Sequence, residues 1–171
     1  MAKGYSQIPG MDYVDVFSPV VRLETLRAIL ALAAVEDWEI CHMDVKGAYL
    51  NGILKEKIYM DQPEGFTDGT MSVCELLKTL YGLKQSGREW NIQLNKKLTS
   101  RGFKNLYSDP CVYIRTGPDG TQIITVWVDD LVIFTITIKS MTNLKREISE
   151  IFEVTDLGEP NKIVGIEISR N

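Results

Sequence analysis

The sequence predicts an α+β fold in which helices pack on one face of an antiparallel sheet. Segments with apolar residues at helical spacing alternate along the chain with short segments rich in β-branched residues. Some of those short segments are joined by tight-turn residues instead of by helices, which is typical of antiparallel hairpins. The length of 171 residues and the apolar fraction of 44% are sufficient for one domain with a single core.

Each element is predicted by a local pattern. The N-terminal stretch up to Pro19 has Gly, Pro, Asp and Tyr without a sustained period, so we expect an extended arm. Apolar residues recur at helical spacing in three segments, which predicts helices over 22–35, over a segment containing 90–98 and ending near Gly102, and over 141–151. Strands are expected at 38–45, 57–61, 73–78, 111–115, 122–128, 131–134 and 162–168.

The net charge of −4 argues against a protein that binds a phosphate backbone, because such proteins normally have a basic surface. This objection is limited, since net charge averages over all surfaces and a magnesium site itself concentrates carboxylates. Two basic clusters occur, although they are more typical of solvated helix faces. The clusters are Lys96, Lys97, Arg101 and Lys104, and Lys139, Lys145 and Arg146.

Membrane and thiol-metal classes are disfavoured. The longest apolar run, 28–35, is far shorter than the ~20 residues of a membrane helix, and no secretion signal begins the chain, so we expect a cytoplasmic or nuclear protein. Cys41, Cys74 and Cys111 lack partners at the spacing of a zinc or redox site, and we expect buried thiols. His42 alone makes no metal site, and we expect a strand residue beside a functional group.

Three aspartates are the candidates for chemistry. Asp129 and Asp130 occupy the expected tip of a hairpin, where two adjacent carboxylates repel each other and an external positive charge would stabilise them. Asp44 ends another expected strand. If the two strands are neighbours, three carboxylates suit two magnesium or manganese ions and nucleotidyl transfer. The alternative is a polar turn without function, since such pairs are common in turns.

Four blocks resemble, in order and spacing, the reverse transcriptase of copia-type retrotransposon Pol polyproteins. The blocks are Met43–Gly52, Ile58–Phe66, Leu80–Gln85 and Trp127–Asp130, and the resemblance runs from Lys3 to about Ile168. It implies the fingers-palm core of a right-hand polymerase over residues 1–171, without the upstream fingers strand, the thumb and the ribonuclease H part. The implied location is a virus-like particle in the cytoplasm, with the nucleus as the alternative.

The activity that the resemblance implies is RNA-directed DNA polymerisation. A primer 3′-hydroxyl would attack the α-phosphate of a deoxynucleoside triphosphate, on an RNA or DNA template, with two metal ions and with other parts of the polyprotein as partners. The implied metal ligands are Asp44, Asp129, Asp130 and the backbone of Val45. The implied nucleotide-binding residues are Tyr49, Lys84, Gln85 and Arg22, and the implied primer-binding residues are Trp127, Val128 and Gly165.

Each nucleotide assignment has a physical reason beside it. Tyr49 resembles a steric gate that disfavours a ribose 2′-hydroxyl, although an ordinary core aromatic is the alternative. Gln85 would contact the nucleotide, and Lys84 or Arg88 would add charge for its phosphates. Arg22 is equally typical of a solvated residue at a helix start.

The primer assignments rest on two segments. Trp127 and Val128 precede the paired aspartates, and Gly165 would let backbone approach backbone in the segment that supports the primer strand. A plain edge strand is the alternative for 156–158 and 163–165.

Departures from the family pattern concern activity. Trp127 stands where the family usually has Tyr, which removes a hydroxyl and adds bulk. Ser86-Gly87 stands where the family commonly has Ala-Pro. The segment 134–138 has larger residues than the small turn residues that usually follow the two aspartates in the family. Without a thumb, we expect weak binding of the primer and slow or absent turnover.

The competing hypothesis is a non-catalytic remnant that keeps the fold as a nucleic-acid or protein interaction domain. A different metal-dependent phosphotransferase is disfavoured, because the other blocks would have no reason to match.

Overall fold

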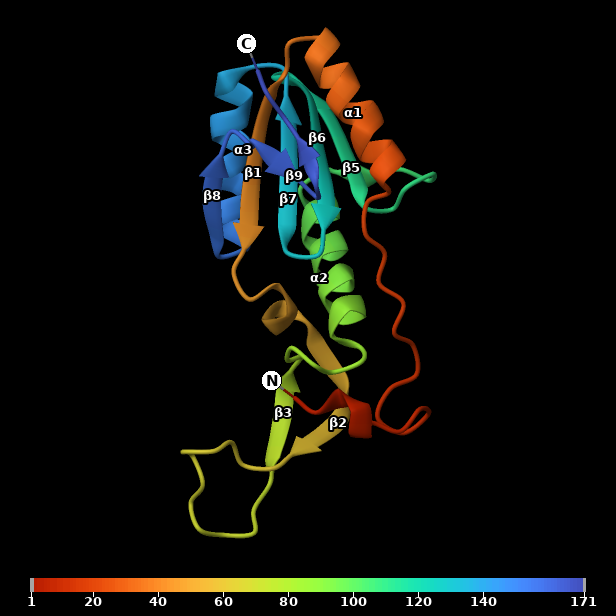
Figure 1. The fold of residues 1–171 in the computed structure, drawn as a ribbon, viewed down its shortest axis with the longest axis vertical. Coiled ribbons are helices and arrows are strands. Elements are labelled where there is room, and N and C mark those ends of the chain that lie inside the picture. Colours follow the sequence, from red (N-terminus) through yellow and green to blue (C-terminus); the bar gives the residue numbers. More distant parts are fainter. Residues whose placement is uncertain (1, 171) are drawn as a thin grey trace. The chain divides into compact units, whose positions relative to one another are not determined.

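The computed structural model describes residues 2–170 and divides the chain into two compact units (Figure 1). Unit 1 comprises Met1–Ser18 and Gly47–Lys96, and unit 2 comprises Pro19–Lys46 and Lys97–Asn171. Each unit is therefore built from two separate stretches of chain. The helices are α1 (Leu23–Val35), α2 (Ser86–Ser100) and α3 (Ile138–Ile151), with short 3-10 turns η1 (Gly4–Ser6) and η2 (Ala48–Asn51).

The helical spacing in the sequence located all three helices. Helix α1 begins one residue after the expected start, and α2 ends at Ser100, close to the expected stop. Helix α3 begins at Ile138, three residues before the expected start, because the Thr137 side chain accepts a hydrogen bond from the Ser140 backbone N–H at 3.1 Å and caps the helix.

Unit 2 contains a six-stranded antiparallel sheet in the order β4-β5-β6-β7-β1-β8. The antiparallel sheet agrees with the sequence, which predicted four of the six strands. The edge strands β4 and β8 were not predicted as strands, although an edge strand was the alternative considered for 156–158. The strands are β1 (Glu39–Val45), β4 (Lys104–Asn105), β5 (Val112–Gly117), β6 (Gly120–Trp127), β7 (Asp130–Thr135) and β8 (Val154–Gly158).

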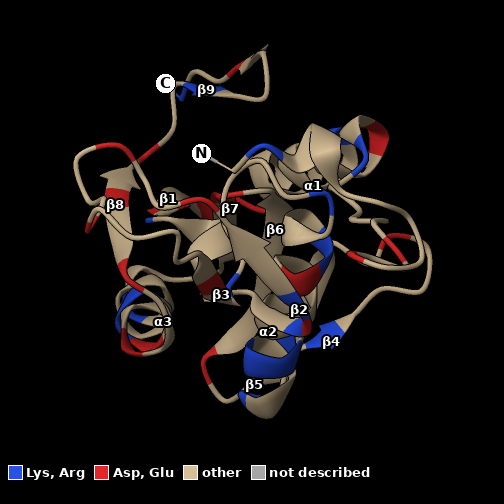
Figure 2. Ribbon diagram, turned by 90° about the horizontal axis from the view of Figure 1, so that it is seen from below, with Lys and Arg blue, Asp and Glu red and all other residues tan. Residues whose placement is uncertain are grey.

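Helices cover both faces of this sheet, so the expectation that they share one face is wrong. The Cys41 thiol of β1 contacts Asp156, which is ion-paired with Lys145 of α3. Ile40 precedes Cys41 and so points to the opposite face, where it lines a cavity of about 540 Å³ with Leu30 of α1. Figure 2 shows α1 and α3 on opposite sides of the sheet. Apolar spacing identifies the buried side of a helix but not the sheet face against which it packs.

One part of the core of unit 2 lies between α3 and the sheet. Its central residues are Ile124 of β6, Leu131 and Ile133 of β7, and Leu144 and Ile148 of α3, each at most 1% exposed. Burial of five such side chains supplies roughly 1.5–3 kcal/mol each towards folding. This contact fixes the position of β7, whose first residue is Asp130.

A charged network crosses the same face at the β5 end. The Arg115 guanidinium donates to both Glu147 carboxylate oxygens at 2.8 and 2.6 Å and to the Gln122 amide oxygen at 2.7 Å. It also lies 4.3 Å from the centroid of the Phe103 ring. The hydrogen bonds from Arg115 hold the pKa of Glu147 below its usual value.

The last segment of the chain is a hairpin, whereas the sequence pattern predicted one strand over 162–168. Strand β9 (Lys162–Ile163) turns back into β10 (Ile166–Glu167). The two linking residues, Val164 and Gly165, have φ of 45° and 83°. Positive φ at both central residues is the geometry of a type I′ hairpin turn, which ends an extended strand.

Unit 1 is built around a two-stranded antiparallel ribbon, β2 (Ile53–Met60) and β3 (Cys74–Lys78), and the first part of α2. Both strands were predicted, although β2 begins four residues earlier than expected. The residues up to Pro19 form the expected arm, apart from η1 and a few local turns. Trp90 and Leu94 of α2 are at most 2% exposed and provide the core of this unit.

Two of the three cysteines are buried as expected, whereas Cys74 is only partly buried. Burial raises the pKa of the Cys41 thiol to about 11 and that of the Cys111 thiol to about 12, so both are neutral at neutral pH. Their chemistry is therefore that of small apolar side chains. Within residues 2–170, no helix has the length and apolar character required to cross a bilayer.

Candidate functional site

Two of the candidate aspartates lie opposite each other in the sheet. Strand β1 pairs with β7 in a register that makes Asp44 the cross-strand partner of Asp130. Directly opposed residues in an antiparallel pair place their side chains on the same face, with Cβ atoms roughly 4.5–5.5 Å apart. The sequence left open whether these strands are neighbours, and the sheet order shows that they are.

The third aspartate lies in the turn between β6 and β7. Trp127 pairs with Asp130, so the turn consists of Val128 and Asp129, and Asp130 is already a strand residue. The expected turn, Asp129-Asp130, is therefore displaced by one residue. The Val45 backbone N–H donates to the Asp129 carbonyl oxygen at 2.8 Å, which ties the turn to the end of β1.

Val128 has a strained backbone, with φ of 55°. Only the first of the two turn residues has positive φ, as in a type II′ turn, where glycine is preferred. A β-branched residue in this region costs roughly 1–3 kcal/mol.

Replacing Val128 with glycine is therefore expected to raise the free energy of unfolding by about 1 kcal/mol, because relief of strain exceeds the entropic cost of glycine. Urea denaturation measures this change. The control Val126→Gly, at a buried strand position, is expected to lower stability. A decrease for Val128→Gly would show that the turn is not strained.

His42 belongs to this site, although the sequence did not identify it as a site residue. Its Nε2 atom lies 2.6 Å from Oδ1 of Asp130, and the two side chains are 17% and 39% exposed. The sequence placed His42 and Asp44 on one face of β1, and the contact shows that the neighbour of His42 is the candidate metal ligand Asp130. The missing information was the register with β7, which brings Asp130 within reach of the imidazole.

The donor chemistry of this site fits a hard divalent cation. Three carboxylates from adjoining positions offer oxygen ligands, which magnesium prefers. As the side chains lie, no group of three or more His, Cys, Asp or Glu among residues 2–170 is arranged to hold a metal ion. The contact with His42 directs one oxygen of Asp130 to the imidazole. The backbone of Val45 is engaged through its N–H, and its role as a ligand stays a prediction.

The candidate primer-binding residues of unit 2 lie at two turns, the β6–β7 turn and the β9–β10 turn. Trp127 is half-buried, and because it pairs with Asp130 it shares that residue's face. Gly165 lies in the β9–β10 turn, where an added Cβ would meet no atom within 4 Å. Within the described chain no close contact requires this glycine, whereas its φ of 83° favours glycine on conformational grounds. Close approach of a primer backbone to Gly165 stays a prediction.

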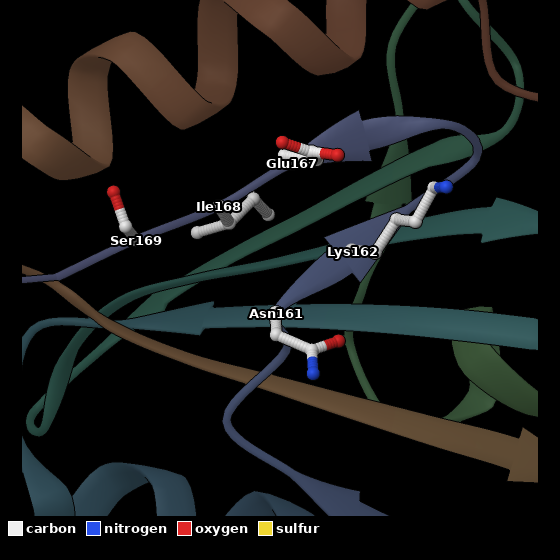
Figure 3. A pocket seen from close by; sticks show the side chains of 5 residues that line it. All are labelled: Asn161, Lys162, Glu167, Ile168 and Ser169. Atoms are coloured by element: carbon white, nitrogen blue, oxygen red, sulfur yellow. The ribbon is translucent and has the colours of Figure 1, made fainter.

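The β9–β10 hairpin borders a shallow hollow of about 410 Å³ (Figure 3). Its lining contains none of the residues assigned to a site from the sequence. The hollow therefore gives no support to the primer assignment, which remains a prediction. The lining residues are Asn161, Lys162, Glu167, Ile168 and Ser169.

Three of the nucleotide candidates lie in unit 1. The ring of Tyr49 packs on that of Tyr81 with centroids 4.7 Å apart, and its carbonyl oxygen accepts a hydrogen bond from the Thr79 hydroxyl. Lys84 is exposed, whereas Gln85 is 2% exposed. The Tyr49 ring is thus packed on one side and half-buried, which is compatible with either a gate or a core residue.

Arg22 belongs to unit 2 and occupies the N-cap position of α1. Its backbone N–H donates to the buried Asp109 carboxylate at 2.9 Å, which fixes the start of the helix. The residue itself is exposed, as expected for the solvated alternative. Its nucleotide role stays a prediction.

Three residues of the predicted basic clusters form ion pairs with acids in unit 2. Such pairing supports their interpretation as helix surface rather than as a phosphate-binding patch. The pairs are Arg101 with Glu150, Lys139 with Asp119, and Lys145 with Asp156, at 3.1, 3.8 and 2.9 Å.

Comparison with known proteins identifies the family. The family model described as reverse transcriptase (RNA-dependent DNA polymerase) matches residues 1–171. The chain belongs to this reverse transcriptase family. It is 41% identical to the retrovirus-related Pol polyprotein from transposon TNT 1-94 of Nicotiana tabacum and 38% identical to that from transposon RE1 of Arabidopsis thaliana, each over 99% of this chain. No solved structure gives a significant match.

These relatives confirm the resemblance to copia-type Pol polyproteins. The reverse transcriptase chain spans only 13% and 12% of the length of the two polyproteins. A putative transposon Ty5-1 protein of Saccharomyces cerevisiae is 35% identical over 75% of this chain and 42% of its own length.

Proposed function

We propose that this chain is the catalytic core of an RNA-directed DNA polymerase, with unit 2 as palm and unit 1 as fingers. The observation that carries the proposal is the register of β1 and β7, which sets Asp44 opposite Asp130, next to Asp129 in the turn. Two like charges directly opposite each other destabilise a sheet. An arrangement with that cost is readily explained if a cation neutralises it.

In this proposal, Asp44, Asp129 and Asp130 bind the metal ions, and the backbone of Val45 contributes. Two divalent ions would activate the attacking primer oxygen and neutralise the leaving oxygen. The hydrogen bond between Val45 and Asp129 keeps the turn at the end of β1, so the carboxylates stay at adjoining positions. In this proposal the sheet fixes the backbone positions from which the three carboxylates would reach the metal ions.

The nucleotide candidates have separate roles in this proposal. We propose that Tyr49 limits the space beside the sugar, that Lys84 and Arg22 attract the phosphates, and that Gln85 supports this region. Template, primer and deoxynucleoside triphosphates are the partners in this proposal, together with the rest of the polyprotein.

A second candidate function is a non-catalytic remnant, and one observation favours it. The Asp130 carboxylate contacts the His42 imidazole, and Trp127 of β6 is the cross-strand partner of Asp130. Both neighbours compete with a metal ion or a primer for the space beside the carboxylate. The remnant hypothesis predicts a folded protein that does not extend a primer.

Primer extension on poly-rA annealed to oligo-dT, with magnesium or manganese, distinguishes the two. We expect extension by the chain and its loss in Asp129→Asn. Because the Asp129 carbonyl receives the hydrogen bond from Val45, this variant keeps the backbone contact and changes only the side chain. No extension by a wild-type protein with a cooperative unfolding transition would favour the remnant.

A further inference from the structure

One residue of the N-terminal arm, Gln7, holds two consecutive candidate nucleotide residues of unit 1. Its side-chain oxygen accepts from the Lys84 backbone N–H at 2.8 Å. Its side-chain nitrogen donates to the Gln85 side-chain oxygen at 3.0 Å. A single amide thus bridges the backbone of one residue and the side chain of the next.

The arm binds the other end of the Gln85 amide as well. The Gln85 side-chain nitrogen donates to the Asp12 carbonyl oxygen at 2.9 Å. Because the oxygen faces Gln7 and the nitrogen faces Asp12, the amide has one orientation that satisfies both contacts. With Gln85 only 2% exposed, its main effect is to fix the loop rather than to present a free amide to a ligand.

The part of the arm that makes these contacts is itself ordered by hydrogen bonds. The Asp12 carboxylate accepts from the Ile8 backbone N–H at 2.7 Å, and the Asp12 backbone N–H donates to the Ile8 carbonyl oxygen at 2.9 Å. The Gly10 N–H donates to the Tyr13 carbonyl oxygen at 2.8 Å. This closed loop, residues 8–13, is a fixed support for Gln85.

The N-terminal arm makes different contacts with Lys84 and Arg88, the two cations that could bind the phosphates of the nucleotide. Arg88 forms an ion pair with Asp15 of the arm at 3.0 Å, which neutralises its charge. Lys84 has an exposed side chain, and its backbone N–H is the group held by Gln7. The arrangement commits Arg88 to the arm and presents the Lys84 ammonium to solvent.

We propose that Gln7 is a positioning residue that locks the Lys84–Gln85 loop and thereby orients the Lys84 ammonium towards the nucleotide triphosphate. The inference rests on the proposed function and deepens it. It assigns phosphate attraction to Lys84 rather than to Arg88, and it assigns to Gln85 a supporting contact with the arm. Loss of the Gln7 amide would leave the loop and the Gln85 oxygen without these hydrogen bonds.

Steady-state primer extension with dTTP tests this role. Gln7→Ala is expected to raise KM for dTTP about tenfold while kcat changes less than about twofold, as for a residue that acts on ground-state binding. Ser6→Ala is the matched control, because the Ser6 hydroxyl donates to the Lys3 carbonyl oxygen at 2.8 Å within the same arm. Arg88→Ala is expected to leave KM within about twofold, whereas Lys84→Ala raises it as Gln7→Ala does.

A double variant shows whether Gln7 acts through Lys84. If it does, Gln7→Ala adds no further increase in KM in a Lys84→Ala background, because the interaction is already lost. Full additivity of the two changes would overturn the proposal. So would a Gln7→Ala variant that lowers kcat and thermal stability with KM unchanged, which would indicate a structural role alone.

Failure of this inference and failure of the proposed function give different results. Extension by the wild type, its loss in Asp129→Asn, and equal KM values for Gln7→Ala and Ser6→Ala would keep the polymerase and overturn the role of Gln7. If the wild type does not extend, polymerase activity fails. Equilibrium binding of a fluorescent dTTP analogue then decides, with weaker binding by Gln7→Ala than by Ser6→Ala supporting the positioning role and equal binding overturning it.

Discussion

Replacing Asp44 with asparagine is expected to reduce the rate of primer extension on the order of 10³-fold while making the protein slightly more stable. The loss follows from removal of one of the carboxylates that would hold the metal ions. The gain, roughly 0.2–1 kcal/mol, follows because Asp44 and Asp130 are directly opposed like charges in the sheet. Extension kinetics and urea denaturation of the same preparations measure the two effects.

The control for this experiment is Asp119→Asn. Asp119 lies in the turn between β5 and β6 of the same sheet and forms a long ion pair with Lys139 at 3.8 Å. Its removal is expected to leave extension unchanged, because surface ion pairs contribute little. A loss of activity together with a gain in stability in Asp44→Asn would show that the opposed charges of Asp44 and Asp130 are kept for function. A loss of both together would instead assign Asp44 a structural role.

Local patterns in the sequence were sufficient for most of the elements. Alternation placed His42 and Asp44 on one face of β1, and the apolar spacing of Leu144 and Ile148 located α3. Such patterns depend only on the period of a helix or a strand. The hairpin between β5 and β6 was also predicted, because Pro118 and Asp119 are typical turn residues.

Features that depend on pairing between distant strands could not be predicted in the same way. The register of β1 with β7 sets the contact between His42 and Asp130, and no local pattern contains that register. The position of the β6–β7 turn could not be predicted either, because Val128 is an unusual residue for a position with φ of 55°. Turn preferences alone favour the two aspartates there.

The contacts of the N-terminal arm could not be predicted from the sequence for a further reason. Gln7 and Gln85 are separated by 78 positions in the sequence, and glutamine has no pattern that indicates an amide pair. A resemblance to a family identifies Gln85 as a candidate but does not show what its amide contacts. Burial and hydrogen-bond partners had to come from the structure.

Replacing Arg115 with methionine is expected to lower the free energy of unfolding by about 2 kcal/mol, which is near the lower end for a partly buried ion pair. Methionine fills similar volume but leaves the Glu147 carboxylate, which is 21% exposed, without its two short hydrogen bonds. The Gln122 amide oxygen and the Phe103 ring lose a partner as well. Thermal unfolding should show a decrease in Tm of roughly 4–8 °C for a chain of this size.

The double variant Arg115→Met with Glu147→Met tests the cause of this loss. It is expected to be more stable than Arg115→Met alone, because it also removes the Glu147 carboxylate, which in Arg115→Met keeps a long contact with Arg101 at 3.8 Å but loses its two short hydrogen bonds. Acid gives an independent check. The pKa of Glu147 is lower in the folded protein than its ordinary value of 4.5, so its stabilising contribution is present above pH 4.5 and is lost as the pH falls through the folded pKa. The stability difference between wild type and Glu147→Gln should therefore shrink below pH 4.5, and a difference that stays constant into acid would mean that the ion pair does not stabilise the fold.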